Sequence, residues 1–277
     1  MIAWKLKHWR VVGVAAAFSV AACGGEGGET GASGGEGGEA GEGGDVVAPP
    51  TPAPSAEAPA PAAGGEAGEA GAQTAYAGLE GDQRIALRLH HLLGFVLAAE
   101  RALQDNNVQP MDAAILVQQG VLEVYDAAPT EFGTLNADVI RAAADMELPR
   151  DQLTQRLNAA KAEIARASGA LDDDAAITVA RLVDISTGLY QLVIQQDFVD
   201  PIEYQHSMGA ALAARAALRE AQSDLRGRDA GAYTEANREL DRFVALWPSA
   251  TAPEAPTPYN QLLAAGSRIR FALSPYL

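Results

Sequence analysis

The hydrophobic residues that follow residue 76 recur every three or four positions, the spacing that places them on one face of a helix. Stretches with this pattern cover residues 79–106, 111–126, 129–146, 151–168, 172–196, 200–226, 231–246 and 259–273. No run of alternating polar and apolar residues is bounded by turn residues, which argues against a sheet. The pattern predicts an all-α fold, an antiparallel bundle of about seven or eight helices.

The clearest local signal for a helix start lies at Asp200-Pro201-Ile202-Glu203. Asp200 is a good N-cap residue, and proline is well accommodated in the first turn. Glu203 stands at the third helical position, where it is expected to complete a capping box. Gly227 is expected to end this helix, since glycine is common just after a helix C-terminus.

The first 22 residues have the pattern of a secretory signal. Three basic residues precede an uncharged, mostly apolar run at positions 11–22. That run is shorter than the roughly 20 residues that a membrane span needs, so it fits a signal peptide better. The alternatives are a signal peptide that does not involve the cysteine and a short anchor helix.

The run ends in Val20-Ala21-Ala22-Cys23, which resembles the lipobox of bacterial lipoproteins. The resemblance implies that residues 1–22 are removed and that Cys23 carries acyl chains and palmitate-type lipidation. It also implies a cell-envelope location. Gly24 stands where an aspartate would favour retention at the inner membrane, so we expect the outer membrane, with the folded domain in the periplasm.

Residues 24–75 read as a linker. They hold 16 of the 28 glycines, a proline-rich middle, nine acidic residues and no basic one. Such a segment buries too little apolar surface to offset its backbone entropy, so we expect disorder. The chain thus divides into a signal peptide at 1–22, a lipidated cysteine with its linker at 23–75, and a helical domain at 76–277.

Charge and composition exclude several classes of function. The chain has a formal net charge of −16, and residues 76–277 hold 27 acidic and 17 basic residues. This balance argues against a nucleic-acid partner, which requires clustered basic residues. A single cysteine excludes an internal disulfide framework and a cysteine-based zinc site. No phosphate-binding loop or nucleophile elbow is present, and we expect no catalytic activity.

Five residues are candidate metal ligands. Glu203 and His206 form a Glu-x-x-His pair, which places a carboxylate and an imidazole on one helix face, as in di-iron bundles. His90 and His91 are consecutive, so one can face the core while the other faces solvent. Glu123 lies on a helix face from which it could join either histidine. The alternative interpretation makes Glu203 a capping residue, His206 a surface side chain and His91 an ordinary core histidine.

Two segments resemble known families. Residues 181–183, Tyr190 and residues 198–205 resemble the helical periplasmic domains associated with oxidase-dependent bacterial iron permeases. Residues 89–103 are similar to the first helix of imelysin-like envelope proteins. The resemblance covers about 60 residues of the domain. It implies a role in iron handling and points to Glu203 and His206, with His91 next.

Two functions follow from these observations. The first is a lipid-anchored helical binding or scaffold protein of the cell envelope that contacts another envelope protein. The second is a periplasmic accessory lipoprotein that binds iron or another divalent metal. The second requires Glu203 and His206 to converge with His90 or His91 and a further carboxylate within about 5 Å.

Overall fold

The computed structural model describes residue 72 and residues 74–195 and 198–277. All of them belong to one unit, residues 58–277. The predicted signal peptide, the lipidated Cys23 and the linker up to residue 71 lie outside the described residues. Along the described chain, no helix is long and apolar enough to cross a membrane.

The prediction of an all-α domain is confirmed. The described residues form nine α-helices, three short helices of other types and one small hairpin. The α-helices are α2 (Gly81–Leu103), α3 (Pro110–Gly120), α4 (Ala137–Arg141), α5 (Arg150–Ser168), α6 (Ala175–Tyr190), α7 (Pro201–Glu220), α8 (Gln222–Arg228), α9 (Ala230–Val244) and α10 (Tyr259–Leu273). The short helices are the 3₁₀ helices η1 (Thr74–Tyr76) and η3 (Pro129–Glu131) and the π-helix η2 (Val121–Tyr125).

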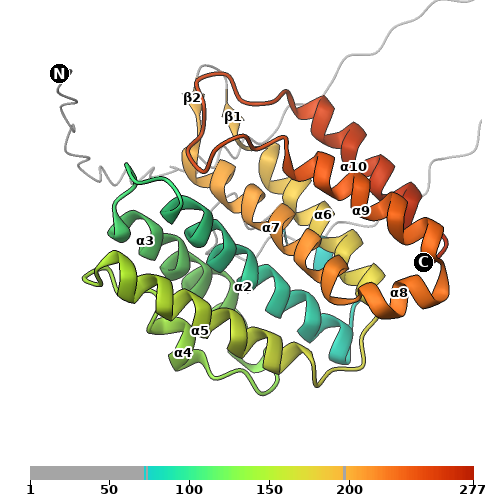
Figure 1. Cartoon of the computed structure of the whole chain (residues 1–277), viewed down its shortest axis with the longest axis horizontal. Helices are drawn as coiled ribbons and strands as arrows, with labels where there is room; N and C mark the ends of the chain where they lie inside the picture. Colours follow the sequence, from blue (N-terminus) through green and yellow to red (C-terminus); the bar gives the residue numbers. More distant parts are fainter. Residues whose placement is uncertain (1–71, 73, 196–197) are drawn as a thin grey trace, which may run out of the picture. The chain divides into compact units, whose positions relative to one another are not determined.

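Helices α2 and α7 run antiparallel through the middle of the bundle (Figure 1). Helices α3, α4 and α5 lie on the α2 side, whereas α6, α9 and α10 lie on the α7 side (Figure 1). Most long helices share one direction or its reverse, as in an antiparallel bundle. A pocket between α2 and α7 therefore lies at the centre of the bundle.

Two glycines bring α2 and α7 into backbone contact. A Cβ placed on Gly209 would lie 2.6 Å from the carbonyl oxygen of Gly94, and one on Gly94 would lie 2.9 Å from the carbonyl of Gly209. Only glycine allows an approach this close. The crossing point therefore fixes the separation and the register of the two central helices.

The core on the α7 side centres on Trp247, which is fully buried. Its ring meets Tyr190 and Phe243 edge to face, at centroid distances of 5.5 and 5.1 Å. Its Nε1 donates to Ser207 Oγ at 3.1 Å, so the one polar atom of the indole is satisfied, as burial requires.

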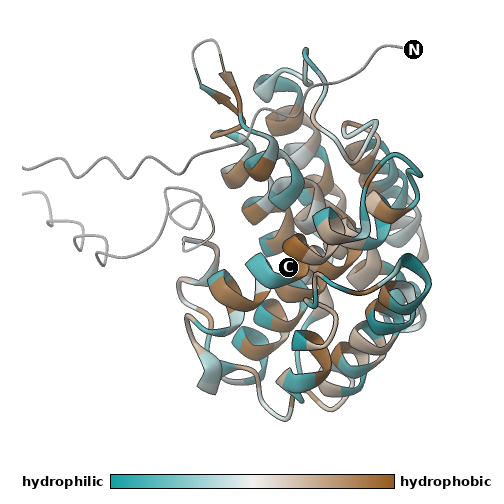
Figure 2. Cartoon of the chain, turned by 90° about the vertical axis from the view of Figure 1, so that its left-hand side faces the viewer, coloured by the Kyte–Doolittle hydropathy of each residue, from teal (hydrophilic) through white to brown (hydrophobic). Residues whose placement is uncertain are grey.

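The structure corrects the expectation of no sheet. Strands β1 (Ile194–Gln195) and β2 (Phe198–Val199) pair antiparallel between α6 and α7. Each strand has two residues, too few for an alternating pattern to be recognisable in sequence. Ile194 and Phe198 are 44% and 49% exposed, and Figure 2 shows the hairpin projecting from one end of the helices with hydrophobic residues on its strands. As a consequence, α6 ends at Tyr190 and does not continue to residue 196.

Several predicted helix ends also differ. The long helix predicted from Asp200 breaks at Ala221 and continues as α8, with Gly227 inside α8 instead of beyond its end. The segment predicted over 129–146 is a 3₁₀ turn followed by the five-residue α4. By contrast, the N-cap at Asp200 is confirmed, since its side chain accepts from the backbone N–H of Ile202 and Glu203. The predicted helix 259–273 also coincides with α10.

Candidate functional site

A cavity of about 310 Å³ lies where η1, α2, η2 and α7 meet. Its polar lining consists of Tyr76, Arg84, Arg88, His91, Glu123 and His206, and we call it the histidine cavity. Arg84, Arg88 and His91 are four and three residues apart on α2, so they share one face of that helix. The cavity thus collects ionisable side chains from four separate elements.

His91 is 6% exposed and is held by Tyr76. The Tyr76 hydroxyl lies 2.7 Å from Nδ1 of His91. If the phenol donates this bond, the neutral ring carries its proton on Nε2. That Nε2 atom is buried and has no hydrogen-bond partner among the described residues. A buried donor without an acceptor is costly, and it points to an acceptor supplied from elsewhere.

His206 enters the cavity from the second turn of α7. Its Nε2 lies 3.1 Å from Oε1 of Gln119, and its Nδ1 lies 3.5 Å from Oε2 of Glu123. The Phe95 ring contacts both imidazoles, with its centroid 5.6 Å from that of His91 and 4.8 Å from that of His206. Both histidines are buried.

Burial keeps both imidazoles neutral. It lowers the pKa of His91 to about 3, with a further lowering from the nearby His206 and Arg88. It also lowers the pKa of His206 to about 4, although the Glu123 carboxylate would favour the charged ring. Each ring can therefore donate one hydrogen bond and accept another at neutral pH, and neither adds charge to the cavity.

Two arginines supply the positive charge. The Nε atoms of Arg84 and Arg88 donate to the same oxygen of Glu131, at 3.0 and 2.6 Å. Burial alone would raise the pKa of the Glu131 carboxyl, but its bonds to Arg88 and Arg84 outweigh burial and lower it. The Arg88 guanidinium lies 4.5 Å from the centroid of the Tyr76 ring, a cation–π contact. Glu131 thereby fixes both arginines at the cavity wall.

The π-helix η2 sets the position of Glu123. It follows α3 directly at Gly120, where a Cβ would lie 2.7 Å from the Cβ and Cγ atoms of Phe95. A glycine at this point lets the chain pass against the Phe95 ring. Single-turn π-helices are frequent at functional sites because they shift side chains out of the regular helical register.

The structure brings three of the five predicted ligands to this cavity, namely His91, His206 and Glu123. His90 points elsewhere, with Nδ1 2.9 Å from the Ala86 carbonyl oxygen and Nε2 3.7 Å from Glu220. Glu203 lies in the first turn of α7 and is not part of the lining.

Three expectations about these residues are wrong. His206 is a buried side chain and not a surface one, and His90 is as buried as His91, each being 6% exposed. The capping box at Glu203 does not form, because the backbone N–H of Asp200 donates to the Val193 carbonyl at 2.8 Å instead. The hairpin that precedes α7 therefore takes the donor that Glu203 was expected to satisfy.

Tyr76, Arg84 and Arg88 were not predicted as site residues. The two arginines could have been found, since their spacing from His91 places all three on one helix face. Tyr76 gives no comparable signal, because it lies at the edge of the predicted linker and reaches His91 through a fold that only the tertiary structure creates.

The donor set fits a metal ion poorly. Within the described part of the chain, no group of three or more histidine, cysteine, aspartate or glutamate side chains is placed to hold a metal. Nδ1 of His91 is engaged by Tyr76, and the arginines add positive charge beside the imidazoles. Hydrogen-bond donors and guanidinium groups suit the oxygen atoms of an organic ligand better.

Comparison with protein-family models, with curated proteins and with solved structures found no match. The resemblance to iron-permease-associated and imelysin-like domains therefore stays a prediction.

Proposed function

We propose that this protein is a lipid-anchored, non-catalytic binding protein of the bacterial cell envelope and that the histidine cavity holds its ligand. The observation that supports the proposal is the buried Nε2 of His91, which has no hydrogen-bond partner among the described residues and belongs to a cavity lined by two arginines. A small organic molecule with a carboxylate or carbonyl oxygen would supply the missing acceptor. Pockets of this kind are the usual ligand sites of proteins.

The ligand is expected to be of modest size and to carry at most one or two negative charges. The cavity volume of about 310 Å³ is at the lower end of the range for ligand pockets. Glu131 already neutralises part of the arginine charge, and Glu123 adds a carboxylate near His206. Phe95 and Leu189 supply apolar wall for the remainder of the molecule.

Calorimetric titration of the full chain with acetate, succinate and pyruvate, at a pH near 7.5, tests the cavity. We expect one of them to bind, and His91→Gln to weaken it by roughly 10- to 100-fold, the effect of losing a hydrogen bond to a charged group. His90→Gln is the matched control, because His90 is adjacent in sequence and equally buried but lies outside the cavity.

Equal weakening by the two variants, or no binding of any of the three compounds, would contradict the proposal. A second titration, with ferrous and zinc ions, tests the alternative that the cavity binds a metal. Stoichiometric metal binding that is lost in both His206→Gln and Glu123→Gln would replace the proposed function by metal handling.

A separate experiment tests the proposed lipid anchor at Cys23. Replacing Cys23 with serine removes the only thiol that could carry acyl chains. Because multiple acyl chains anchor far more firmly than one, the variant is expected to move entirely from the membrane to the soluble fraction. Fractionation with a carbonate wash measures this, and unchanged membrane retention of Cys23→Ser would refute lipid anchoring.

A further inference from the structure

A second groove lies between α2 and α7, lined by Leu97, Glu100, Arg101, Leu212, Arg215 and Arg219, and we call it the arginine groove. Its volume is about 310 Å³. The α2 residues of this groove and those of the histidine cavity point to nearly opposite faces of the helix, by the 100° rotation per residue. The arginine groove is therefore separate from the proposed ligand cavity.

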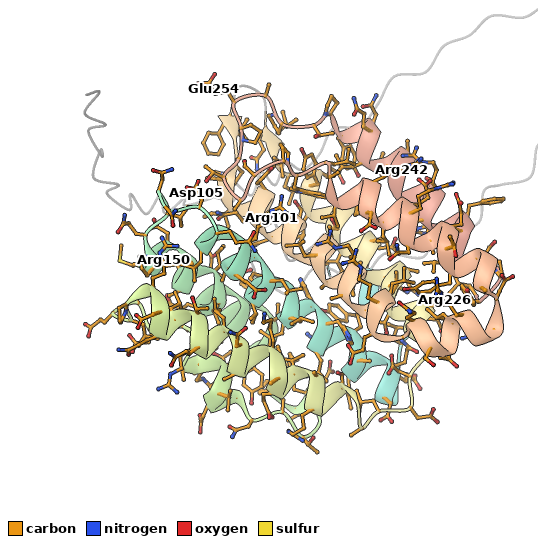
Figure 3. All side chains as sticks on the ribbon, viewed as in Figure 1. Arg101, Asp105, Arg150, Arg226, Arg242 and Glu254 are labelled. Carbon is orange, nitrogen blue, oxygen red and sulfur yellow. The ribbon has the colours of Figure 1, made fainter. Side chains whose placement is uncertain are left out.

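Three guanidinium groups gather at the arginine groove. Side chains of a helix lean toward its N-terminus, so the arginines of the antiparallel helices α2 and α7 lean toward one another. Figure 3 marks Arg101 on α2 beside α7. Arg215 and Arg219 are four residues apart on α7, a spacing at which like charges repel.

The acidic side chains around the arginine groove do not neutralise all of its positive charge. Asp241 is shared by Arg219, at 2.8 Å, and Arg215, at 3.8 Å. Among the described residues, Glu100 is the only acidic one in the lining, and the Lys161 ammonium already pairs with it. Arg101 donates to the Trp247 carbonyl at 2.8 Å and has no carboxylate partner among the described ion pairs. The groove keeps surplus positive charge in a domain whose acidic residues outnumber its basic ones.

The surroundings of Arg215 show the strain of this arrangement. Its pKa is lowered by burial first and then by the neighbouring charge of Arg219; Asp241 opposes this lowering, and Arg101 adds a smaller one. A side chain that is only 28% exposed and faces two like charges is stabilised by any anion that enters the groove.

We propose that the arginine groove binds a phosphate group, either of a soluble phosphate ester or of a lipid headgroup. Arginine forks match phosphate oxygens bidentately. A phosphate ester carries between one and two negative charges, so it compensates more of the surplus than a single carboxylate does. Leu97, Leu212 and the neighbouring Ala216 provide apolar wall for the alcohol part of the ester.

The test is titration of the full chain with inorganic phosphate and with glycerol phosphate at low salt. We expect both to bind, the ester more tightly, with affinity falling as salt is added. Arg215→Gln should weaken binding at least tenfold. Arg215→Lys should weaken it less, because lysine keeps the positive charge but lacks the bidentate guanidinium group. Arg156→Gln is the control, an exposed arginine on α5 outside the groove.

A circular dichroism spectrum and melting temperature like those of the wild type establish that each variant is folded. If neither inorganic phosphate nor glycerol phosphate binds, or if Arg156→Gln and Arg215→Gln weaken binding equally, the proposal is overturned.

Binding to vesicles of phosphatidylglycerol distinguishes the source of the phosphate. This experiment uses the Cys23→Ser variant so that acyl chains do not contribute. Loss of vesicle binding in Arg215→Gln assigns a lipid headgroup, whereas loss of ester binding alone assigns a soluble ligand.

Discussion

Lowering the pH from 7.5 to 5 is expected to reduce the free energy of unfolding by about 4 kcal/mol through His91 and His206. The folded protein holds both imidazoles neutral, with pKa values of about 3 and about 4, below the unfolded value of 6.5. The unfolded chain therefore binds protons below pH 6.5 that the folded chain does not. Each histidine contributes about 1.4 kcal/mol per pH unit in this range, or about 2 kcal/mol at pH 5.

The sign of this effect follows from the direction of the shifts. Above pH 6.5 the histidines are neutral in both states and the stability does not depend on their titration. As the pH falls toward the folded pKa values, stability is lost. Carboxylates with lowered pKa values, such as Glu131 and Glu163, lose their stabilising contribution only at lower pH, below their ordinary value of 4.5. The interval between pH 6.5 and 5 therefore reports mainly on histidines.

Urea unfolding at a series of pH values, followed by circular dichroism, measures this slope. The variants His91→Gln and His206→Gln should each remove about half of it, whatever their effect on stability at neutral pH. A slope that is the same in both variants as in the wild type would mean that neither ring is held neutral by the fold.

The second prediction concerns the contact between α2 and α7. Gly209→Ala is expected to destabilise the protein by about 1–3 kcal/mol, the usual cost of overpacking. The added methyl would meet the backbone of Gly94, which cannot rotate aside as a side chain can. The helices would have to separate, which loosens both the histidine cavity and the arginine groove.

The same substitution at Gly227 is the matched control. Gly227 lies inside α8, and a Cβ there would meet no atom within 4 Å. Alanine is favoured over glycine in a helix by up to about 1 kcal/mol, so Gly227→Ala should stabilise slightly. Opposite signs for the two glycine-to-alanine changes are the expected result. A stabilising Gly209→Ala would show that the backbones of α2 and α7 do not touch at Gly94 and Gly209.

Much of the fold could be predicted because helical periodicity and helix caps are local. Tyr259 begins the last helix as expected, and Asp200 caps α7 with two backbone hydrogen bonds. The break at Ala221 could not be foreseen, since alanine is the best helix former and no local signal marks it. The hairpin was missed because its strands are two residues long.

The site was only partly predictable for a related reason. His91, His206 and Glu123 were recognised by residue type, and they do meet in one cavity. Their burial was not foreseen, because it depends on Phe95 and on the close crossing of α2 and α7, which are tertiary features. The gathering of Arg101 with Arg215 was missed because more than a hundred residues separate them in sequence.

The contact between Tyr76 and His91 places the N-terminal limit of the histidine cavity before the N-terminal limit of the helical bundle. The long helices begin at Gly81, so a chain that starts near Glu80 would keep every α-helix described here. It would lose Tyr76 and Ala72, which form one wall of the histidine cavity, and His91 would lose the partner of its Nδ1. Under the proposed function, the segment that completes the ligand cavity is therefore distinct from the segment that forms the nine α-helices, and cleavage between residues 76 and 80 is expected to abolish ligand binding while the α-helices remain.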